Sequence, residues 1–140
     1  MPEESTTPDL EELARRMSEA WNARDIEASG SLLTADTVYD LSPMGGPIFE
    51  GRAAVRDAVG EFWAMWDEFE SEAEDIFDLG NGVSLTVAVS RGRIRGTTGS
   101  VQQRAVTVGT WTDGLIERAT VYGDIDEARA AAERLAQERG

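Results

Sequence analysis

TVYDLSPMGGPIFEGRAAVRDAVGEFWAMW, residues 37–66, is the stretch that decides the fold. It begins with β-branched and aromatic residues, passes through a loop rich in proline and glycine, and continues as a run with helical period. The stretch therefore predicts a strand over 36–41, a crossing loop and a helix over 52–69. The apolar residues of the helical run recur at steps of four, three, four and three: Val55, Val59, Phe62, Trp66 and Phe69.

The chain on either side predicts more helices, and then strands. Thr7 followed by Pro8 favours a helix start, and apolar residues follow it with helical period as far as Trp21. Asp25 is expected to cap a short helix that runs to Leu33. After Phe69 the apolar period changes from about 3.6 to about 2 residues, which is typical of strands. The predicted strands are 71–79, 83–95, 101–111 and 115–122, and a last helix starts at Asp124 or Asp126.

Turn residues connect the predicted strands. Asn81-Gly82 is a strong signal for a two-residue hairpin, and Asp113-Gly114 lies in a second tight turn. Helices first and hairpin strands later predict an α+β fold, in which an antiparallel sheet wraps around the long helix. Residues 1–7 are expected to form a flexible tail, and 8–140 a single domain.

Composition excludes several classes of function. The chain has 140 residues, with 27 acidic and 13 basic residues and a net charge of −14, and every basic residue is Arg. A field of that sign repels phosphate groups, so we expect neither nucleic acid nor a membrane as a partner. The chain contains no Cys and no His, which excludes disulfides, thiol nucleophiles, Ser-His-Asp triads and the usual zinc sites. No leader-like or membrane-spanning apolar run occurs, so we expect a cytoplasmic protein.

Five short motifs accompany this element order: Trp21 to Asp25, Asp40 to Pro43, Gly51 to Val55, Asp113 to Ile116, and Tyr122 to Asp124. Together they resemble the SnoaL-like branch of the nuclear transport factor 2-like superfamily. The resemblance implies a cone-shaped curved antiparallel sheet around helices (a cystatin-like roll), an apolar cavity and a homodimer formed through the sheet. The superfamily includes ketosteroid isomerases, limonene-type epoxide hydrolases, polyketide cyclases and non-catalytic binding modules, so the function must come from the site.

The resemblance offers catalytic precedents, which the residues match incompletely. Asp40 lies near the position of the isomerase base, but Met17 stands for the isomerase tyrosine and Arg104 for its second acid. An epoxide hydrolase is not expected, since Val106 and Val121 replace its two acids. A cyclase would commonly use a His on the strand before the last one, and Thr107 occupies the corresponding position here.

One candidate catalytic pair remains, Asp40 and Arg104. A carboxylate that faces an aromatic pocket has a raised pKa and suits a general base, and an arginine beside it would hold an enolate or a carbonyl. The alternatives are a plain ion pair or no contact. Strand alternation bears on the choice, because an inward Tyr39 and Leu41 would leave Asp40 on the outer face.

The remaining site predictions concern the cavity wall and the charged strands. Arg91, Arg93 and Arg95 are expected to offset an acidic face of the neighbouring strand, on which Glu70, Glu72, Glu74 and Asp78 lie. Aromatic residues usually fill cores, but so many on helices inside a cone are also expected to line its pocket. The predicted ligand-binding residues are Tyr39, Phe62, Trp63, Trp66, Trp21 and Val121.

The sequence thus predicts binding of a small hydrophobic molecule, steroid- or polyketide-like, in an apolar cavity. Isomerase- or cyclase-type proton transfer through Asp40 and Arg104 is an extension of that prediction, and it requires neither a cofactor nor a metal. The alternative is a non-catalytic dimeric module for ligand binding or interaction, with a pocket filled by its own side chains.

Overall fold

The computed structural model of this protein describes residues 9–140. The tail predicted over 1–7 and the helix cap predicted at Thr7 lie outside the described residues, so the predicted domain bounds of 8–140 stay a prediction. The helices are α1 (Leu10–Ala23), α2 (Ile26–Gly30), α3 (Arg52–Ala64) and α4 (Ile125–Arg139), with a 3-10 turn, η1 (Ser42–Met44). The strands are β1 (Leu33–Asp40), β2 (Ile48–Glu50), β3 (Trp66–Gly80), β4 (Val83–Ile94), β5 (Val101–Thr112) and β6 (Leu115–Tyr122).

Short polar side chains set the helix starts. Asp9 caps α1, because its carboxylate accepts a hydrogen bond from the Glu12 N–H at 2.8 Å. Asp25 caps α2 in the same way, as predicted, although that helix ends at Gly30 rather than at Leu33. Asp124 caps α4 by accepting from the N–H groups of Asp126 and Glu127. The chain therefore begins these helices where a carboxylate satisfies the first free amides.

The helix predicted over 52–69 ends at Ala64, which corrects that prediction. Trp66 already belongs to β3 and is paired with Ile94 of β4. The spacing of Phe62, Trp66 and Phe69 fits a helix, but the long β4 partner supplies ladder hydrogen bonds that a longer helix would forfeit. Phe62, Trp66 and Phe69 still form one aromatic cluster across the junction, with ring centroids 5.2–6.0 Å apart.

The sheet has the strand order β2-β1-β6-β5-β4-β3. Its neighbouring strands are antiparallel except β1 and β6, which run parallel, so the sheet is mixed and the purely antiparallel prediction is wrong for that pair. Tight turns make successive strands antiparallel, but β1 meets the last strand of the chain, and no turn fixes their relative direction. The α+β fold of the prediction is confirmed.

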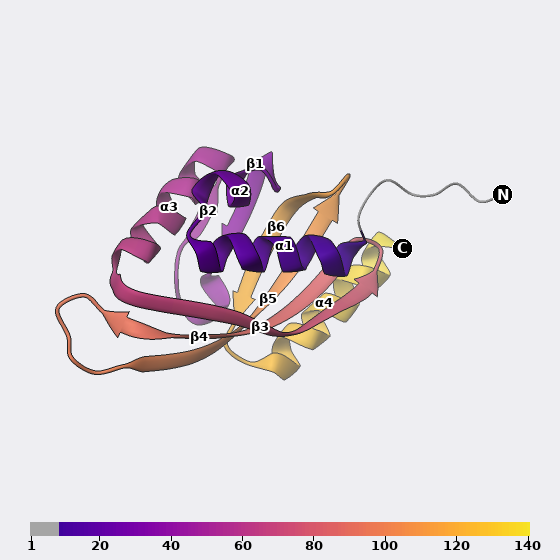
Figure 1. The fold of residues 1–140 in the computed structure, drawn as a ribbon. Coiled ribbons are helices and arrows are strands. Elements are labelled where there is room, and N and C mark those ends of the chain that lie inside the picture. The colour runs from indigo at the N-terminus through magenta and orange to yellow at the C-terminus, as the bar shows by residue number, and fades with distance from the viewer. Residues whose placement is uncertain (1–8) are drawn as a thin grey trace.

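Two hydrophobic clusters divide the molecule into layers on either side of the sheet (Figure 1). We call the side of the sheet under α1, α2 and α3 the inner face, and the side against α4 the outer face. The inner cluster joins Leu13 of α1 and Val59 of α3 to Trp111 of β5. The outer cluster joins Ala128 and Ala132 of α4 to residues of β4 and β5. A small residue at each contact lets α4 lie close to the sheet.

The β3–β4 hairpin confirms two predictions. Asn81 and Gly82 have φ values of 57° and 79°, the left-handed pair that a tight hairpin of this type requires. Beyond them, Arg91 pairs with Glu70 at 3.9 Å, and Arg93 pairs with Asp67 at 3.0 Å. The arginine stripe thus offsets carboxylates of the neighbouring strand, although Arg93 uses Asp67 and Glu68 rather than the predicted set.

Candidate functional site

Strand register settles which side of the sheet Asp40 occupies. Asp40 is in register with Thr120 of β6, Thr120 with Val108 of β5, and Val108 with Leu85 of β4. Residues in one such row share a face. Val108 and Leu85 belong to the outer cluster against α4, so Asp40 lies on the outer face, away from the helices of the cone.

The neighbouring row occupies the inner face. It consists of Tyr39, Ala119, Gly109 and Ser84, and Tyr39 and Ala119 pack against the inner cluster. A second inner row begins at Val121 and continues through Thr107 to Thr86. The middle of the inner face is therefore made of small side chains, and Tyr39, Thr86, Thr107 and Ala119 remain partly exposed.

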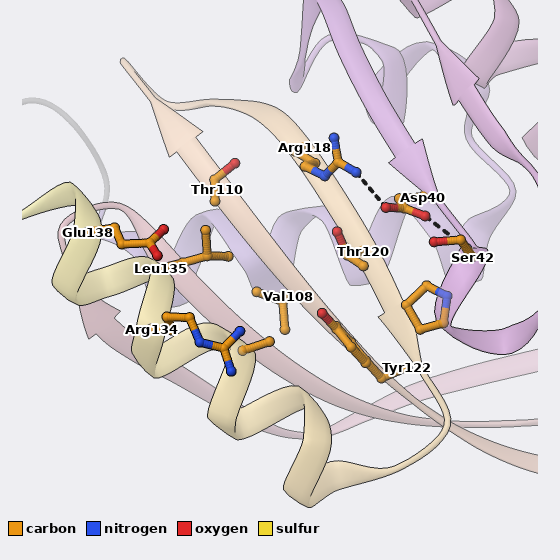
Figure 2. A pocket seen from close by; sticks show the side chains of 12 residues that line it. Asp40, Ser42, Val108, Thr110, Arg118, Thr120, Tyr122, Arg134, Leu135 and Glu138 are labelled. Carbon is orange, nitrogen blue, oxygen red and sulfur yellow. Dashed lines mark hydrogen bonds and ion pairs between the residues drawn. The ribbon is translucent and has the colours of Figure 1, made fainter.

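The negative charge of Asp40 is balanced by partners within the protein. Its side chain is 8% exposed and pairs with Arg118 at 2.5 Å, while the Ser42 N–H donates to its other oxygen at 2.8 Å (Figure 2). Burial acts to raise the pKa of Asp40, but the hydrogen bonds from Ser42 and the bond and charge of Arg118 together outweigh it and lower the pKa. Asp40 is therefore an ionised carboxylate at neutral pH, with its basicity reduced.

The structure does not bring Asp40 and Arg104 together. Arg104 pairs with Glu74 of β3 at 3.0 Å and is 60% exposed. Val108 is the β5 residue in the same cross-sheet row as Asp40. Arg104 lies four residues along β5 from Val108, a displacement of about 13 Å at roughly 3.3 Å per residue. The shared catalytic role predicted for these residues therefore lacks the contact that it requires. The partner of Asp40 is Arg118, which the sequence did not single out.

The aromatic residues predicted to line the cavity form a continuous cluster above the inner face. Trp21 contacts Phe62 and Trp63 with ring centroids 5.6 and 5.4 Å apart, and Phe62 contacts Trp66 at 6.0 Å. The indole nitrogens of Trp63 and Trp66 are buried and have no hydrogen-bond partner within residues 9–140. By contrast, the indole nitrogen of Trp111 donates to the Ser84 hydroxyl at 2.9 Å.

Tyr39 joins this wall from the sheet. Its ring stacks on Phe49 with centroids 6.5 Å apart, and burial raises the pKa of Tyr39 to about 12. The phenol is therefore un-ionised at neutral pH, and can donate a hydrogen bond but not act as a base. Val121, the last predicted wall residue, is 7% exposed and lies on the same face.

Two open pockets of the described residues lie outside this aromatic wall. The first has a volume of about 360 Å³ and opens on the outer face between the sheet and α4, with Asp40, Arg118, Tyr122 and Arg134 in its lining. The second, of about 260 Å³, lies between α1 and β3. Within residues 9–140, no group of three acidic side chains is arranged to hold a metal ion, and no helix is long and apolar enough to cross a membrane.

Solved structures with the same fold align with most of the chain. A hypothetical protein from Catenulispora acidiphila with a ketosteroid isomerase-like fold, in complex with trimethylamine, is 20% identical with a TM-score of 0.73, covering 91% of this chain and 94% of its own. The epoxide hydrolase/cyclase-like enzyme SalBIII, which acts in pyran ring formation in the polyether salinomycin, is 20% identical with a TM-score of 0.70, covering 82% and 90%. TerC, co-crystallised with polyporic acid, is 16% identical with a TM-score of 0.68, covering 88% and 96%.

At these identities the likeness concerns the fold, and the functions of those proteins remain their own. A search of curated protein sequences finds no match. The sequence itself matches the family described as SnoaL-like domain over residues 14–119, which is most of the chain. With the layered cone and mixed sheet described above, this match shows that the chain belongs to the SnoaL-like family.

Proposed function

We propose that this protein binds a small, largely hydrophobic molecule with a hydrogen-bond acceptor such as a carbonyl, between the aromatic wall and the inner face of the sheet. The observation that carries the proposal is the pair of buried indole N–H groups, of Trp63 and Trp66, without partners in residues 9–140. Leaving a buried donor unsatisfied costs about 1–3 kcal/mol, and a ligand acceptor would recover that cost.

The residues of the inner face support this ligand class. Ala119 and Thr107 are small and partly exposed on the inner face, whereas Gly109 is covered by the Trp111 indole, whose nitrogen would lie 3.0 Å from a Cβ there. Aromatic rings cover the opposite side and suit a flat or polycyclic skeleton. Fold neighbours that bind or act on small molecules, including polyporic acid and a polyether precursor, are consistent with this use of the fold.

Binding is favoured over proton transfer at this place. Tyr39 lies in the first inner row, and with a pKa of about 12 it does not accept a proton at neutral pH. The same row ends on β3 at Asp78, which is in register with Ser84 and is exposed. The predicted base, Asp40, lies on the opposite face. Isomerase- or cyclase-type catalysis would therefore require a base other than Tyr39 and Asp40.

A second candidate is the module with a filled pocket, and one observation favours it. Neither of the two pockets described above lies behind the aromatic wall. Native mass spectrometry of protein purified gently from its own host separates the two candidates. A reproducible added mass on the 15.2 kDa chain supports the ligand-binding proposal, and a bare chain supports the filled module.

A pair of tryptophan variants tests the proposed hydrogen bond directly. Calorimetry compares tetralone, a bicyclic ketone, with tetralin, the hydrocarbon of the same skeleton. We expect tetralone to bind more tightly, and Trp63→Phe to weaken its binding by roughly threefold to tenfold, the value of one hydrogen bond.

Trp111→Phe is the matched control, since Trp111 is equally buried but its N–H is already bonded to Ser84. It should lower the melting temperature and leave tetralone affinity unchanged. Trp63→Phe should also lower the melting temperature, because it removes part of a buried indole from the inner cluster. Tetralone affinity is therefore the measurement that distinguishes the two variants. Equal binding of tetralone and tetralin, or equal effects of the two variants on affinity, would contradict the proposal.

A further inference from the structure

The outer-face pocket has a chemistry distinct from that of the cone. Its floor comes from β5 and β6, with Val108, Thr110, Thr120 and Tyr122, and one wall comes from α4. Asp40, Ser42 and Pro43 form the facing wall, together with Arg118 (Figure 2). A volume of about 360 Å³ falls at the small end of ligand sites, roughly 300–1,000 Å³.

Two arginines give this pocket an excess of hydrogen-bond donors. Arg118 donates one hydrogen bond to Asp40 and is 45% exposed, so other N–H groups of its guanidinium remain available. Arg134 makes no ion pair with another residue of the described range 9–140, and Figure 2 shows its guanidinium turned toward the sheet, near Val108 and Tyr122. Burial raises the pKa of Tyr122, and the charge of Arg134 acts against that rise.

The acidic residues of the pocket do not satisfy Arg134. Asp40 already accepts hydrogen bonds from Arg118 and from the Ser42 N–H. Glu138 lies four residues after Arg134 on α4, but an arginine that precedes a glutamate is the weaker orientation for such a pair, and the structure shows no bridge between them. Arg134 is an exposed side chain of α4, and its charge is therefore accessible from the mouth of the pocket.

We propose that the outer-face pocket binds a small monocarboxylate with an aliphatic tail, whose carboxylate pairs with Arg134 on the α4 side of the pocket. The tail would lie on Val108, Ala131 and Leu135, the apolar side chains of the lining. A carboxylate suits guanidinium groups, which present several N–H donors in one plane. Asp40 and Glu138 nearby disfavour an anion of higher charge, such as a phosphate.

Octanoate is the probe, with octanol as its uncharged counterpart, and binding to the full chain is measured by calorimetry. We expect octanoate to bind and octanol to bind much more weakly. Arg134→Gln should weaken octanoate binding about tenfold or more, the loss of a charge-assisted hydrogen bond. Raising the salt concentration should weaken binding to the unmodified protein more than binding to Arg134→Gln.

Arg129→Gln is the matched control, because it removes the same charge from the same helix at a position outside the pocket lining. It should change octanoate affinity by no more than about twofold. Trp63→Phe should also leave octanoate binding unchanged, which separates this site from the cone, so either proposal can fail alone. Absence of octanoate binding at millimolar concentration, equal binding of octanol, or equal effects of Arg134→Gln and Arg129→Gln would overturn the proposal.

Discussion

At the scale of single residues, Asp40 shows how a neighbour decides the chemistry of a carboxylate. Desolvation alone would make it a better base, as the sequence suggested. The Ser42 N–H and the Arg118 guanidinium reverse that effect, and the pKa falls below its ordinary value. Asp40 therefore acts as a structural anion, joining β1 and the loop that follows it to β6.

The pairing predicts a pH-dependent contribution of Asp40 to stability. Because its folded pKa is lowered, the contribution is complete above the unfolded pKa of about 3.9, and is lost as the pH falls through the lower folded value. Asp40→Asn should reduce the free energy of unfolding by about 1–2 kcal/mol at neutral pH, and by progressively less below about pH 4. Urea unfolding of both proteins across this pH range measures the difference.

Asp36→Asn, on the exposed part of β1, is the control for this prediction. It should change the free energy of unfolding by less than about 0.5 kcal/mol at every pH. A constant difference between Asp40→Asn and the unmodified protein from neutral to acid pH would show that the ionised carboxylate contributes nothing.

At the scale of elements, the β3–β4 hairpin ties the sheet to α4. The Asn81 side chain donates to the Ala136 carbonyl at 2.5 Å, and Arg139 donates to the Asn81 carbonyl at 2.7 Å. Gly82 lies at the centre of these contacts, with φ at 79° and room for no side chain, since a Cβ there would lie 2.6 Å from the Trp111 carbonyl. The turn is thus both a hairpin and a docking point for the last helix.

Gly82→Ala should therefore lower the free energy of unfolding by about 1–3 kcal/mol, through a strained φ and a clash with backbone. Gly99→Ala is the control, because Gly99 has no atom within 4 Å of the added Cβ and no positive φ. It should stay within about 0.5 kcal/mol of the unmodified protein. Denaturant unfolding of the two variants measures the difference. Equal unfolding midpoints would refute the role assigned to this turn.

At the scale of the whole molecule, the sheet has one long free edge, β3, and this edge is acidic. Charged side chains on an edge strand oppose pairing with a second sheet. The homodimer implied by the family resemblance would therefore form through a face of the sheet, rather than by extending it at β3. The acidic residues of β3 are Asp67, Glu68, Glu70, Glu72, Glu74, Asp75 and Asp78.

Light scattering at micromolar concentration tests this expectation. We expect a mass of about 30 kDa, which is two chains of 15.2 kDa. Glu70 and Glu72 are in register with Arg91 and Val89 of β4, on the outer face. Replacing both by Gln therefore tests whether this part of the outer face joins the dimer, and an unchanged mass would place the contact elsewhere. A mass of one chain would contradict the dimer, and a larger assembly of the Gln variant would show that the β3 edge is the surface held in check by charge.

The sequence by itself determined the features that depend on near neighbours along the chain. The Asp25 cap, the Asn81-Gly82 hairpin and the alternation of β4 to β6 each follow from the chemistry of a few adjacent residues. These local signals, together with the motifs of the SnoaL-like family, were enough to predict the α+β cone and the aromatic residues above its sheet.

Only the tertiary structure decided the features that depend on distant partners. The end of α3 before Trp66 follows from the pairing of Trp66 with Ile94, and the parallel β1–β6 contact joins strands separated by most of the chain. That contact places Asp40 beside Arg118 rather than Arg104, on the outer face. The physical reason is that strand register and pairing are fixed by packing across the sheet, where a shift of one residue exchanges its two faces.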